Sequence, residues 1–411
     1  MIGYRCIACE TVQEQDFSGY VCPACGSNLD IVYDYASLAP HFPAAAATAS
    51  DIFDFSALLP VSRAAPFPLR IGATPLYRAE RLGTAAGVEH LYLKDETGNP
   101  SASIKDRASA IALQRAIETG ASVVATASTG NAGSSLACLA AAIGVPAVVF
   151  VPASAPVAKL TQLLAHGATV LAVRGNYDAA FELCLAASSE FGWFNRNTGF
   201  NPFTREGKKT CVYEIWQALG GSLPDRIVVS AGDGNVLSGI WKGCTDLQRL
   251  GLIDRLPRVD AAQSKGSDAI SRAVEALRKV DAVDWRSARI DPVNADTVAD
   301  SIAVDQPRDG LAAAKAIIES GGEAVAVADE DILAAITEMA SLAGVFPEPA
   351  AAAPLAALHQ LSSSGRIGPT ERVVLVVSGN GLKDIKHAAE AVPAPTVIEP
   401  SLEAVRRVIR P

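Results

Sequence analysis

Four cysteines near the N-terminus form a compact set of metal-binding side chains. Cys6 and Cys9 are separated by two residues, Cys22 and Cys25 repeat that spacing, and twelve residues lie between the pairs. Each pair can offer two thiolates to one tetrahedral ion, and zinc is the metal typical of four such ligands. We therefore predict a structural zinc ribbon over residues 1–33, because four thiolates leave no open position for catalysis. Two redox pairs are the alternative.

Lys105 is the residue best placed for covalent chemistry. It lies in the segment Ser101–Arg107, where a loop of small residues leads into a helix expected over residues 105–119. The positive potential of a helix N-terminus lowers the proton affinity of an amine and favours its neutral, nucleophilic form. Taken alone, the segment would more often hold a surface lysine in a capped helix.

Two further loops offer backbone donors at the ends of expected strands. Ser128–Asn131 follows a strand expected over residues 123–127, and Gly232–Val236 follows one expected over residues 226–229. Free N–H groups at the start of a helix bind carboxylates and phosphates. Asp233 would repel a phosphate unless its carboxylate points away. Ordinary capped turns are the alternative for each loop.

The elements that must position these loops alternate regularly along the chain. Apolar runs and helical spacing predict strands over residues 91–94, 123–127, 147–151, 170–173, 226–229 and 372–377, with helices over 105–119, 131–142, 157–166, 177–190 and 209–219, and from 237 onward. Such alternation predicts parallel sheets covered by helices. Residues 284–309 are less regular, and the Ala/Pro-rich segment 40–66 is expected to connect the ribbon to the body.

Composition narrows the class of protein. The chain has 411 residues, 49% of them hydrophobic, which allows two domains and an appendage. A net charge of −9 argues against nucleic acid or an anionic membrane as the main partner. We expect a cytoplasmic protein, because the N-terminus lacks a signal peptide and the apolar run 132–151 is broken by glycines and a proline. The cysteines outside the ribbon should be reduced core residues.

The ordered motifs together resemble the pyridoxal-phosphate enzymes of the tryptophan-synthase-β-like fold type II, and within these the threonine synthase family. The resemblance rests on Ser101–Arg107, Ser128–Asn131 and Gly232–Val236, and also on the stretches 201–210, 344–349 and 378–383. It implies an α/β protein with two three-layer domains: a large domain that binds pyridoxal phosphate, formed by 34–110 and 211–411, and a small domain formed by 111–210. A zinc ribbon occurs in some relatives, and a homodimer is expected.

The resemblance also implies roles for individual residues. Lys105 would bind pyridoxal phosphate covalently and then act as general base. Asn131 would face the 3′ oxygen of the cofactor, and Ser378 would hydrogen-bond its ring nitrogen. The phosphate would be held by Gly232, Asp233, Gly234, Asn235 and Val236, and the carboxylate of a small anionic amino-acid substrate by Ser128, Thr129, Gly130 and Asn131. The implied reaction converts O-phosphohomoserine and water into threonine and phosphate.

One departure from the family pattern concerns the substrate. Threonine synthases usually follow Asn-Pro-aromatic with an arginine that helps bind the substrate phosphate, whereas this chain has Thr204 there and Arg205 one residue later. We expect Arg205 to take that role, with Lys159 and Arg196 as other available cations. Two alternatives stay open: a paralogue that performs β-replacement or β-elimination on O-phosphoserine, serine or threonine, such as a cysteate synthase or an ammonia-lyase, and a catalytically silent binding protein.

Overall fold

The strands of the protein form three sheets in the part of the chain that the computed structural model describes, residues 1–40, 42, 48–62 and 67–409. The ribbon sheet is antiparallel, with the order β2 (Val12–Gln13), β1 (Gly3–Cys6), β3 (Leu29–Val32). The large sheet has the order β12 (Ala324–Val327), β11 (Arg258–Ser264), β10 (Arg226–Ser230), β13 (Arg372–Val377), β5 (His90–Asp95), β4 (Leu76–Arg78). The small sheet has the order β8 (Thr169–Val173), β7 (Ala147–Pro152), β6 (Val124–Ala127), β9 (Phe194–Asn195).

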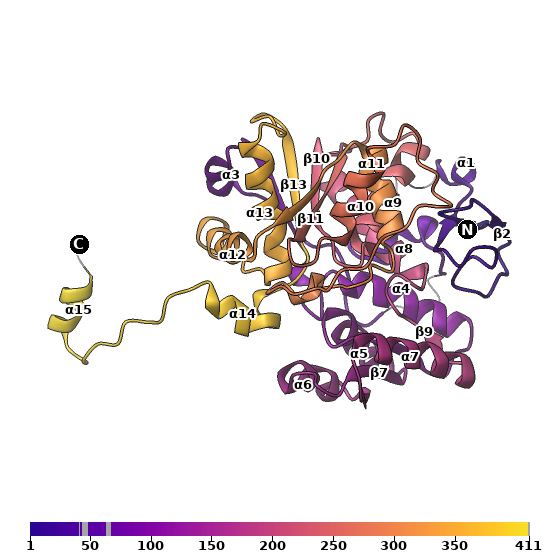
Figure 1. Ribbon diagram of the computed structural model, residues 1–411, viewed down its shortest axis with the longest axis horizontal. Coiled ribbons are helices and arrows are strands. Elements are labelled where there is room, and N and C mark those ends of the chain that lie inside the picture. The colour runs from indigo at the N-terminus through magenta and orange to yellow at the C-terminus, as the bar shows by residue number, and fades with distance from the viewer. Residues whose placement is uncertain (41, 43–47, 63–66, 410–411) are drawn as a thin grey trace.

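Helices cover both faces of the large sheet (Figure 1). Its strands pair in parallel except at the edge, where β4 runs antiparallel to β5. Alternate residues of β10 enter different cores. Ile227 belongs to the core that also holds apolar residues of α4 (Lys105–Glu118), α8 (Phe203–Ala218), α9 (Asn235–Arg249), α10 (Ala269–Leu277) and α11 (Gly310–Ser320). Val228 belongs to the core that holds residues of α3 (Glu80–Ala86), α12 (Asp329–Ala343) and α13 (Pro349–Ser363). This alternation makes three layers.

The small sheet is covered in the same way. Val124 and Val149 enter the main core beside α5 (Asn131–Ile143) and α6 (Val157–Ala165), whereas Ala125 and Phe150 pack with α7 (Tyr177–Phe191) on the other face. All its strand pairs are parallel. The predicted α/β class with parallel sheets is therefore confirmed, and the strands of the small sheet fall within residues 111–210. The domain boundaries themselves stay a prediction.

The sequence patterns did not reveal every strand. Strand β11 was not predicted, because its sequence includes the polar residues Asp260 and Gln263, which are buried. Asp260 is neutralised there by Arg226 at 2.9 Å, and the Gln263 side chain donates to the Ala231 carbonyl. A strand buried on both faces can hold polar side chains when each finds such a partner.

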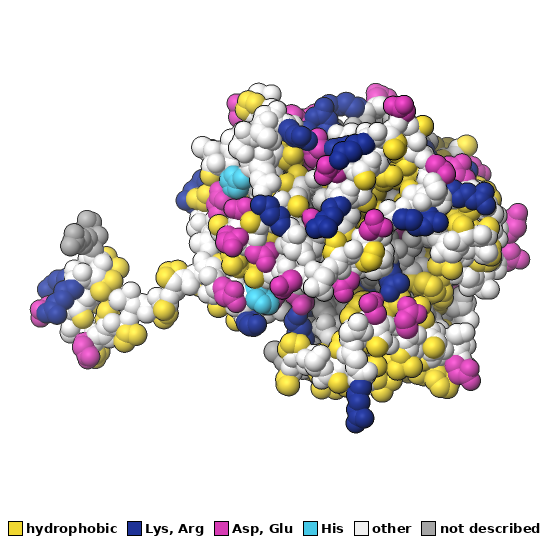
Figure 2. Space-filling view, viewed as in Figure 1, with side chains coloured by type: hydrophobic (Ala, Val, Ile, Leu, Met, Phe, Trp, Pro, Cys, Tyr) yellow, Lys and Arg dark blue, Asp and Glu magenta, His cyan; other side chains and the backbone are white. Residues whose placement is uncertain are grey.

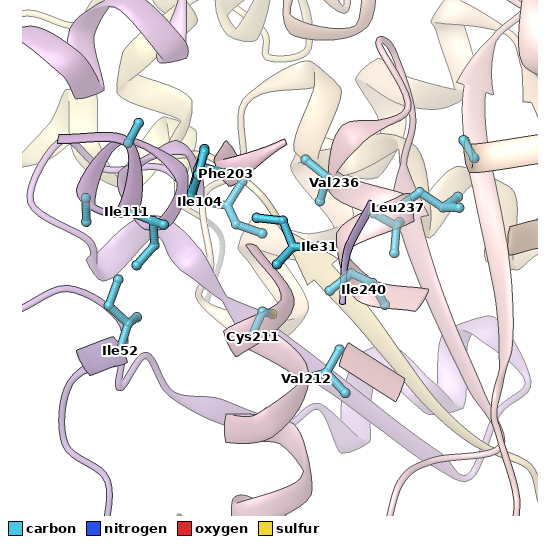
Figure 3. Packing of buried hydrophobic residues seen from close by; sticks show 14 of the residues in the cluster. Ile31, Ile52, Ile104, Ile111, Phe203, Cys211, Val212, Val236, Leu237 and Ile240 are labelled. Carbon is cyan, nitrogen blue, oxygen red and sulfur yellow. The ribbon is translucent and has the colours of Figure 1, made fainter. Parts of the chain in front are cut away.

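The ribbon sheet packs directly on the body. Ile31 of β3 lies among apolar residues of α8 and α9 (Figure 3). Beside it, the Tyr33 hydroxyl donates to Glu206 Oε2 at 2.6 Å, and Lys242 Nζ donates to the Ile31 carbonyl at 2.8 Å. The N-terminal segment therefore shares one hydrophobic core with the body of the protein.

Part of the expected connector 40–66 wraps the same helices. Phe42 and Phe55, the second in the 3-10 helix η1 (Ile52–Leu58), each place a ring 5.2 Å from that of Tyr213 on α8. Positions 41, 43–47 and 63–66 of this connector lie outside the described residues.

The surface carries charged side chains, and the C-terminal segment contributes little to the hydrophobic core. Acidic and basic side chains are interspersed over the face shown in Figure 2. Helix α15 (Leu402–Val408) stands apart from the body, beyond the short helices α14 (Ile385–Glu390) and η4 (Gly381–Asp384) (Figure 1). Among the described residues, no helix has the length and apolarity needed to cross a bilayer.

A buried ion cluster joins α4 to α8 and to the end of β5. Arg107 Nε lies 2.6 Å from Glu96 Oε2, and Arg107 Nη1 lies 2.6 Å from Glu214 Oε1. Lys94 Nζ completes the cluster at 2.6 Å from Glu214 Oε2. Burial raises the pKa of Glu214, but Arg107 and Lys94 outweigh this effect and hold it at about 2. The cluster fixes the first turn of α4, which Lys105 begins.

Replacing Arg107 tests the strength of this connection. Arg107→Met leaves two carboxylates buried without their main counterion, so the free energy of unfolding should fall by about 3–5 kcal/mol in denaturant titrations. Arg255 is the matched control, because its ion pair with Asp225 is exposed, and Arg255→Met should cost less than about 1 kcal/mol. Equal losses in the two variants would show that the cluster does not stabilise the fold.

Candidate active site

A pocket of about 390 Å³ lies where loops from both parallel sheets meet. The strands end at this edge, which is where ligands bind in α/β proteins. The predicted residues that line it are Lys105, Ser128, Thr129, Gly130, Asn131, Gly232, Asp233, Gly234, Asn235, Val236 and Ser378. Segments far apart in the sequence are thus brought together as the motifs suggested.

The backbone around Lys105 is fixed on the side facing β13. Ile104 N donates to the Ser378 carbonyl at 2.9 Å, and Ser103 forms an isolated bridge with Gly379. Ala102 adopts φ 62°, a left-handed conformation that is costly for a residue with a Cβ and persists only where its surroundings enforce it. The loop therefore presents Lys105 at a defined position, as the first residue of α4.

The Lys105 side chain is partly buried, and its amine has no hydrogen-bond acceptor among the described residues. Burial lowers its pKa, and the positive charge of Arg196 adds to this effect, whereas Glu348 and Asp233 oppose it. An amine with a lowered pKa is more often neutral near pH 7, and the neutral form is both nucleophile and base.

Asn131 starts helix α5 and is held by a buried carboxylate. Its Nδ2 donates to Glu348 Oε1 at 2.8 Å and to Glu348 Oε2 at 3.1 Å. Ser301 Oγ donates to the same carboxylate at 3.3 Å, and burial raises the pKa of Glu348. Glu348 thus orients the Asn131 amide within the pocket.

The glycine loop before α9 exposes backbone to the pocket and turns its acidic side chain elsewhere. Asp233 Oδ1 accepts from the Arg308 backbone N–H at 2.5 Å, and Gly234 adopts φ 89° directly before the helix. A Cβ at Gly234 would come within 2.7 Å of the Asp309 carbonyl, so only glycine fits there. Burial raises the pKa of Asp233 to about 7, which reduces its repulsion of an anion.

Two ion pairs join the helices of the small sheet to the irregular segment 284–309. Lys159 on α6 lies 2.6 Å from Asp300, and Arg308 lies 3.2 Å from Asp178 on α7. Residues 300–306 of this segment line the pocket. The segment was expected to be irregular but had been given no role.

Arg205 does not lie in this pocket. Its guanidinium pairs with the buried Asp309 at 2.5 Å and with Asp30 of the ribbon at 3.2 Å. The shift by one residue rotates the side chain about 100° around α8, toward the ribbon and away from the ligand. The expectation that Arg205 binds substrate is therefore not carried into the proposal below.

Several pocket residues were not singled out from the sequence. Thr198 and Lys208 line the pocket beside the glycine loop, and Tyr177 and Asp178 line it from the start of α7. Tyr177 and Asp178 follow the end of a parallel strand, a signal that could have identified them. Glu348 and Lys208 lie in stretches that resemble the family, but their type alone predicts an ordinary surface charge.

The four N-terminal cysteines form one cluster, as predicted. Their sulfur atoms all lie within 4.8 Å of one another. The separation is 3.5 Å between Cys6 and Cys25, 3.6 Å between Cys9 and Cys22, and 3.4 Å between Cys9 and Cys25. Thiolates at about 2.3 Å from one tetrahedral zinc are about 3.8 Å apart, so the donor set fits that ion.

Known proteins resemble this chain over most of its length. It is 37% identical to the threonine synthase of Methanosarcina acetivorans over 410 residues, which cover 100% of this chain and 99% of the relative. It is 36% identical to that of Methanocaldococcus jannaschii, over 99% of each chain. The solved structure of the processed form of threonine deaminase isoform 2 from Solanum lycopersicum covers 92% of this chain and 93% of its own, with a TM-score of 0.66 and 20% identity.

The structural likeness supports the fold alone, because the sequence identity is low. The family assignment rests on the pattern described as "Pyridoxal-phosphate dependent enzyme", which matches residues 68–379. That range includes Lys105 and each of the loops that form the pocket. The chain therefore belongs to the pyridoxal-phosphate dependent enzyme family.

Proposed function

We propose that this protein is a threonine synthase, which converts O-phosphohomoserine and water into threonine and phosphate. The observation that carries the proposal is the pocket itself, where Lys105, the Asn131 loop, the glycine loop and Ser378 meet. The relatives of matching length that are named threonine synthase support the choice of reaction.

The residues of the pocket fit pyridoxal phosphate. A partly buried amine without a hydrogen-bond acceptor, among the residues described, is suited to bind its aldehyde, and the Gly232–Val236 backbone opens a cradle for its phosphate at the start of α9. Ser378 would hydrogen-bond the ring nitrogen and Asn131 the 3′ oxygen. When bound, this cofactor withdraws electrons from the amino acid and makes the proton on Cα acidic.

The side chains of the protein would then hold the substrate and move its protons. The backbone N–H groups of Thr129, Gly130 and Asn131 would bind the substrate carboxylate, since they lie at the start of α5, whereas that of Ser128 already donates to the Phe150 carbonyl at 3.1 Å. Lys105 would take the proton from Cα and then one from Cβ, because burial lowers the pKa of its amine. Loss of phosphate from Cγ, delivery of a proton to Cγ, addition of water at Cβ and return of a proton to Cα would give threonine.

The cysteine cluster is proposed to hold a structural zinc ion. Four thiolates leave no site for a substrate, so the metal would stabilise the ribbon rather than act in catalysis. We also propose a homodimer and a cytoplasmic location, as the resemblance and the sequence suggested.

Replacing Lys105 tests the cofactor assignment. Lys105→Ala should lose the visible absorbance of the lysine-bound cofactor and at least 10³-fold in turnover, as an order-of-magnitude estimate for removing a group that is both ligand and base. Lys279→Ala, an exposed lysine, is the control and should retain both. Retention of the absorbance band by Lys105→Ala would place the cofactor on another residue.

A substrate panel tests the reaction. Purified protein with pyridoxal phosphate should release phosphate and form threonine from O-phosphohomoserine, measured by phosphate assay and amino-acid chromatography. O-phosphoserine, serine and threonine should turn over much more slowly. Turnover of one of these three, with none from O-phosphohomoserine, would favour the β-replacement or β-elimination paralogue instead.

Metal removal tests the ribbon. Metal analysis of the reduced protein should find about one zinc ion per chain, and Cys22→Ser should lose it and unfold at lower temperature, because metal binding contributes to folding energy. Cys138→Ser, outside the cluster, should keep the metal. Full zinc content in the Cys22→Ser protein would contradict the assignment.

A further inference from the structure

Two buried cations in this protein lack an acidic partner. Among the described residues, the buried basic side chains form ion pairs with carboxylates, with two exceptions, Arg196 and Lys208; those that pair are Lys94, Arg107, Arg205, Lys209, Arg226 and Lys242. Burying an unpaired charge is costly, so such groups are retained where a ligand supplies the opposite charge.

The difference between buried cations with and without a carboxylate partner is clearest at two consecutive lysines of α8. Lys209 Nζ lies 2.6 Å from Glu206 Oε2 and 2.8 Å from Asp246 Oδ2, on the side of the helix that faces the ribbon. Lys208 points into the pocket, where its amine donates to Asn235 Oδ1, a neutral acceptor. The two lysines are buried to the same extent, but Lys209 has two carboxylate partners and Lys208 has a neutral one.

The position of Lys208 is set by close packing of α8 on α9. A Cβ at Gly239 would come within 3.0 Å of Lys208 Cβ, so the glycine allows the two helices to approach. This brings the Lys208 amine to Asn235, the first residue of α9 and part of the glycine loop. Asn235 is held in turn, because its Nδ2 donates to Asp309 Oδ2 at 2.8 Å.

The surroundings of Lys208 favour a negatively charged ligand. Burial lowers the pKa of Lys208 well below its usual value, and Lys105 and Arg196 lower it further. Arg196 supports the same side of the pocket: its Nη1 donates to Thr198 Oγ1 at 2.6 Å, and its buried Nη2 finds no partner among the described residues. Groups that can carry a positive charge therefore gather beside the start of α9, whose backbone N–H groups also attract anions, and an anion bound there would favour the charged form of Lys208.

We propose that Lys208 binds the phosphate group of pyridoxal phosphate, adding a charged contact to the backbone cradle of residues 232–236. The ligand is a phosphate monoester, and its position favours the phosphate of the cofactor over that of the substrate because Lys208 is hydrogen-bonded to a residue of the cradle itself. This inference rests on the cofactor site of the proposed function and not on which amino acid is the substrate.

Comparing the cofactor with its dephosphorylated form isolates the contact. Full-length protein freed of cofactor is titrated with pyridoxal phosphate and with pyridoxal, and the absorbance of the lysine-bound aldehyde gives both dissociation constants. Lys208→Met should weaken binding of pyridoxal phosphate about 10- to 100-fold, the range for a hydrogen bond to a charged group, and leave pyridoxal binding unchanged. Lys208→Arg should restore much of the preference for the phosphorylated form.

A stability measurement separates ligand binding from a structural role. Without cofactor, Lys208→Met should melt at the wild-type temperature or above it, because the variant no longer buries an amine that has no acidic partner among the described residues. Lys209→Met is the matched control: it should melt at a lower temperature, because it removes the nearest counterion of the buried Glu206 and Asp246, and should keep the wild-type ratio of the two dissociation constants.

Three results would overturn the inference. Equal weakening of both ligands by Lys208→Met, or a lower melting temperature of that variant without cofactor, would show a structural role. An unchanged ratio with a raised KM for O-phosphohomoserine would assign Lys208 to the substrate phosphate. The proposed function is judged separately, because wild-type protein that binds pyridoxal phosphate but forms no threonine would refute the reaction and still allow the ratio to be measured.

Discussion

The geometry of the site depends on the buried contacts of Arg107. This side chain binds a carboxylate at the end of β5 and another on α8, and so fixes the first turn of α4 against both elements. On the opposite side, the hydrogen bond from Ile104 N to the Ser378 carbonyl ties the same turn to β13. Lys105 is therefore positioned through its backbone neighbours, and its amine remains available for a ligand.

Most buried cations in the described part of the chain form ion pairs. Where a buried cation stabilises the fold, as at Arg226 or Lys242, a carboxylate lies within ion-pair distance of it. Beside the pocket, Lys208 and Arg196 are buried without such a partner among the described residues. The acidic net charge of the chain therefore gives no information about the ligand, whose binding is decided by a few side chains.

The sequence allowed the chemistry at the strand ends to be anticipated, because Lys105, Asn131 and the Gly232–Val236 loop each follow recognisable local patterns. It could not show which side chains from distant parts of the chain contact these residues. Glu348 reaches Asn131 across the fold, and Arg205 turns toward the ribbon because of a one-residue shift on α8. Such side-chain positions depend on tertiary packing. Strand β11 depends on it as well, because its Asp260 can be buried only where Arg226 lies beside it.

Beside the pocket, a buried cation that has no carboxylate partner among the described residues would affect how fast the protein is degraded in the cell. If Lys208 binds the phosphate as proposed, a chain without its cofactor bears the full cost of burying this amine and the loaded chain bears less of it, so ligand binding would add to folding stability. Quality-control proteases degrade the less stable population faster. A shortage of cofactor would therefore reduce the amount of this protein as well as the fraction of it that is active.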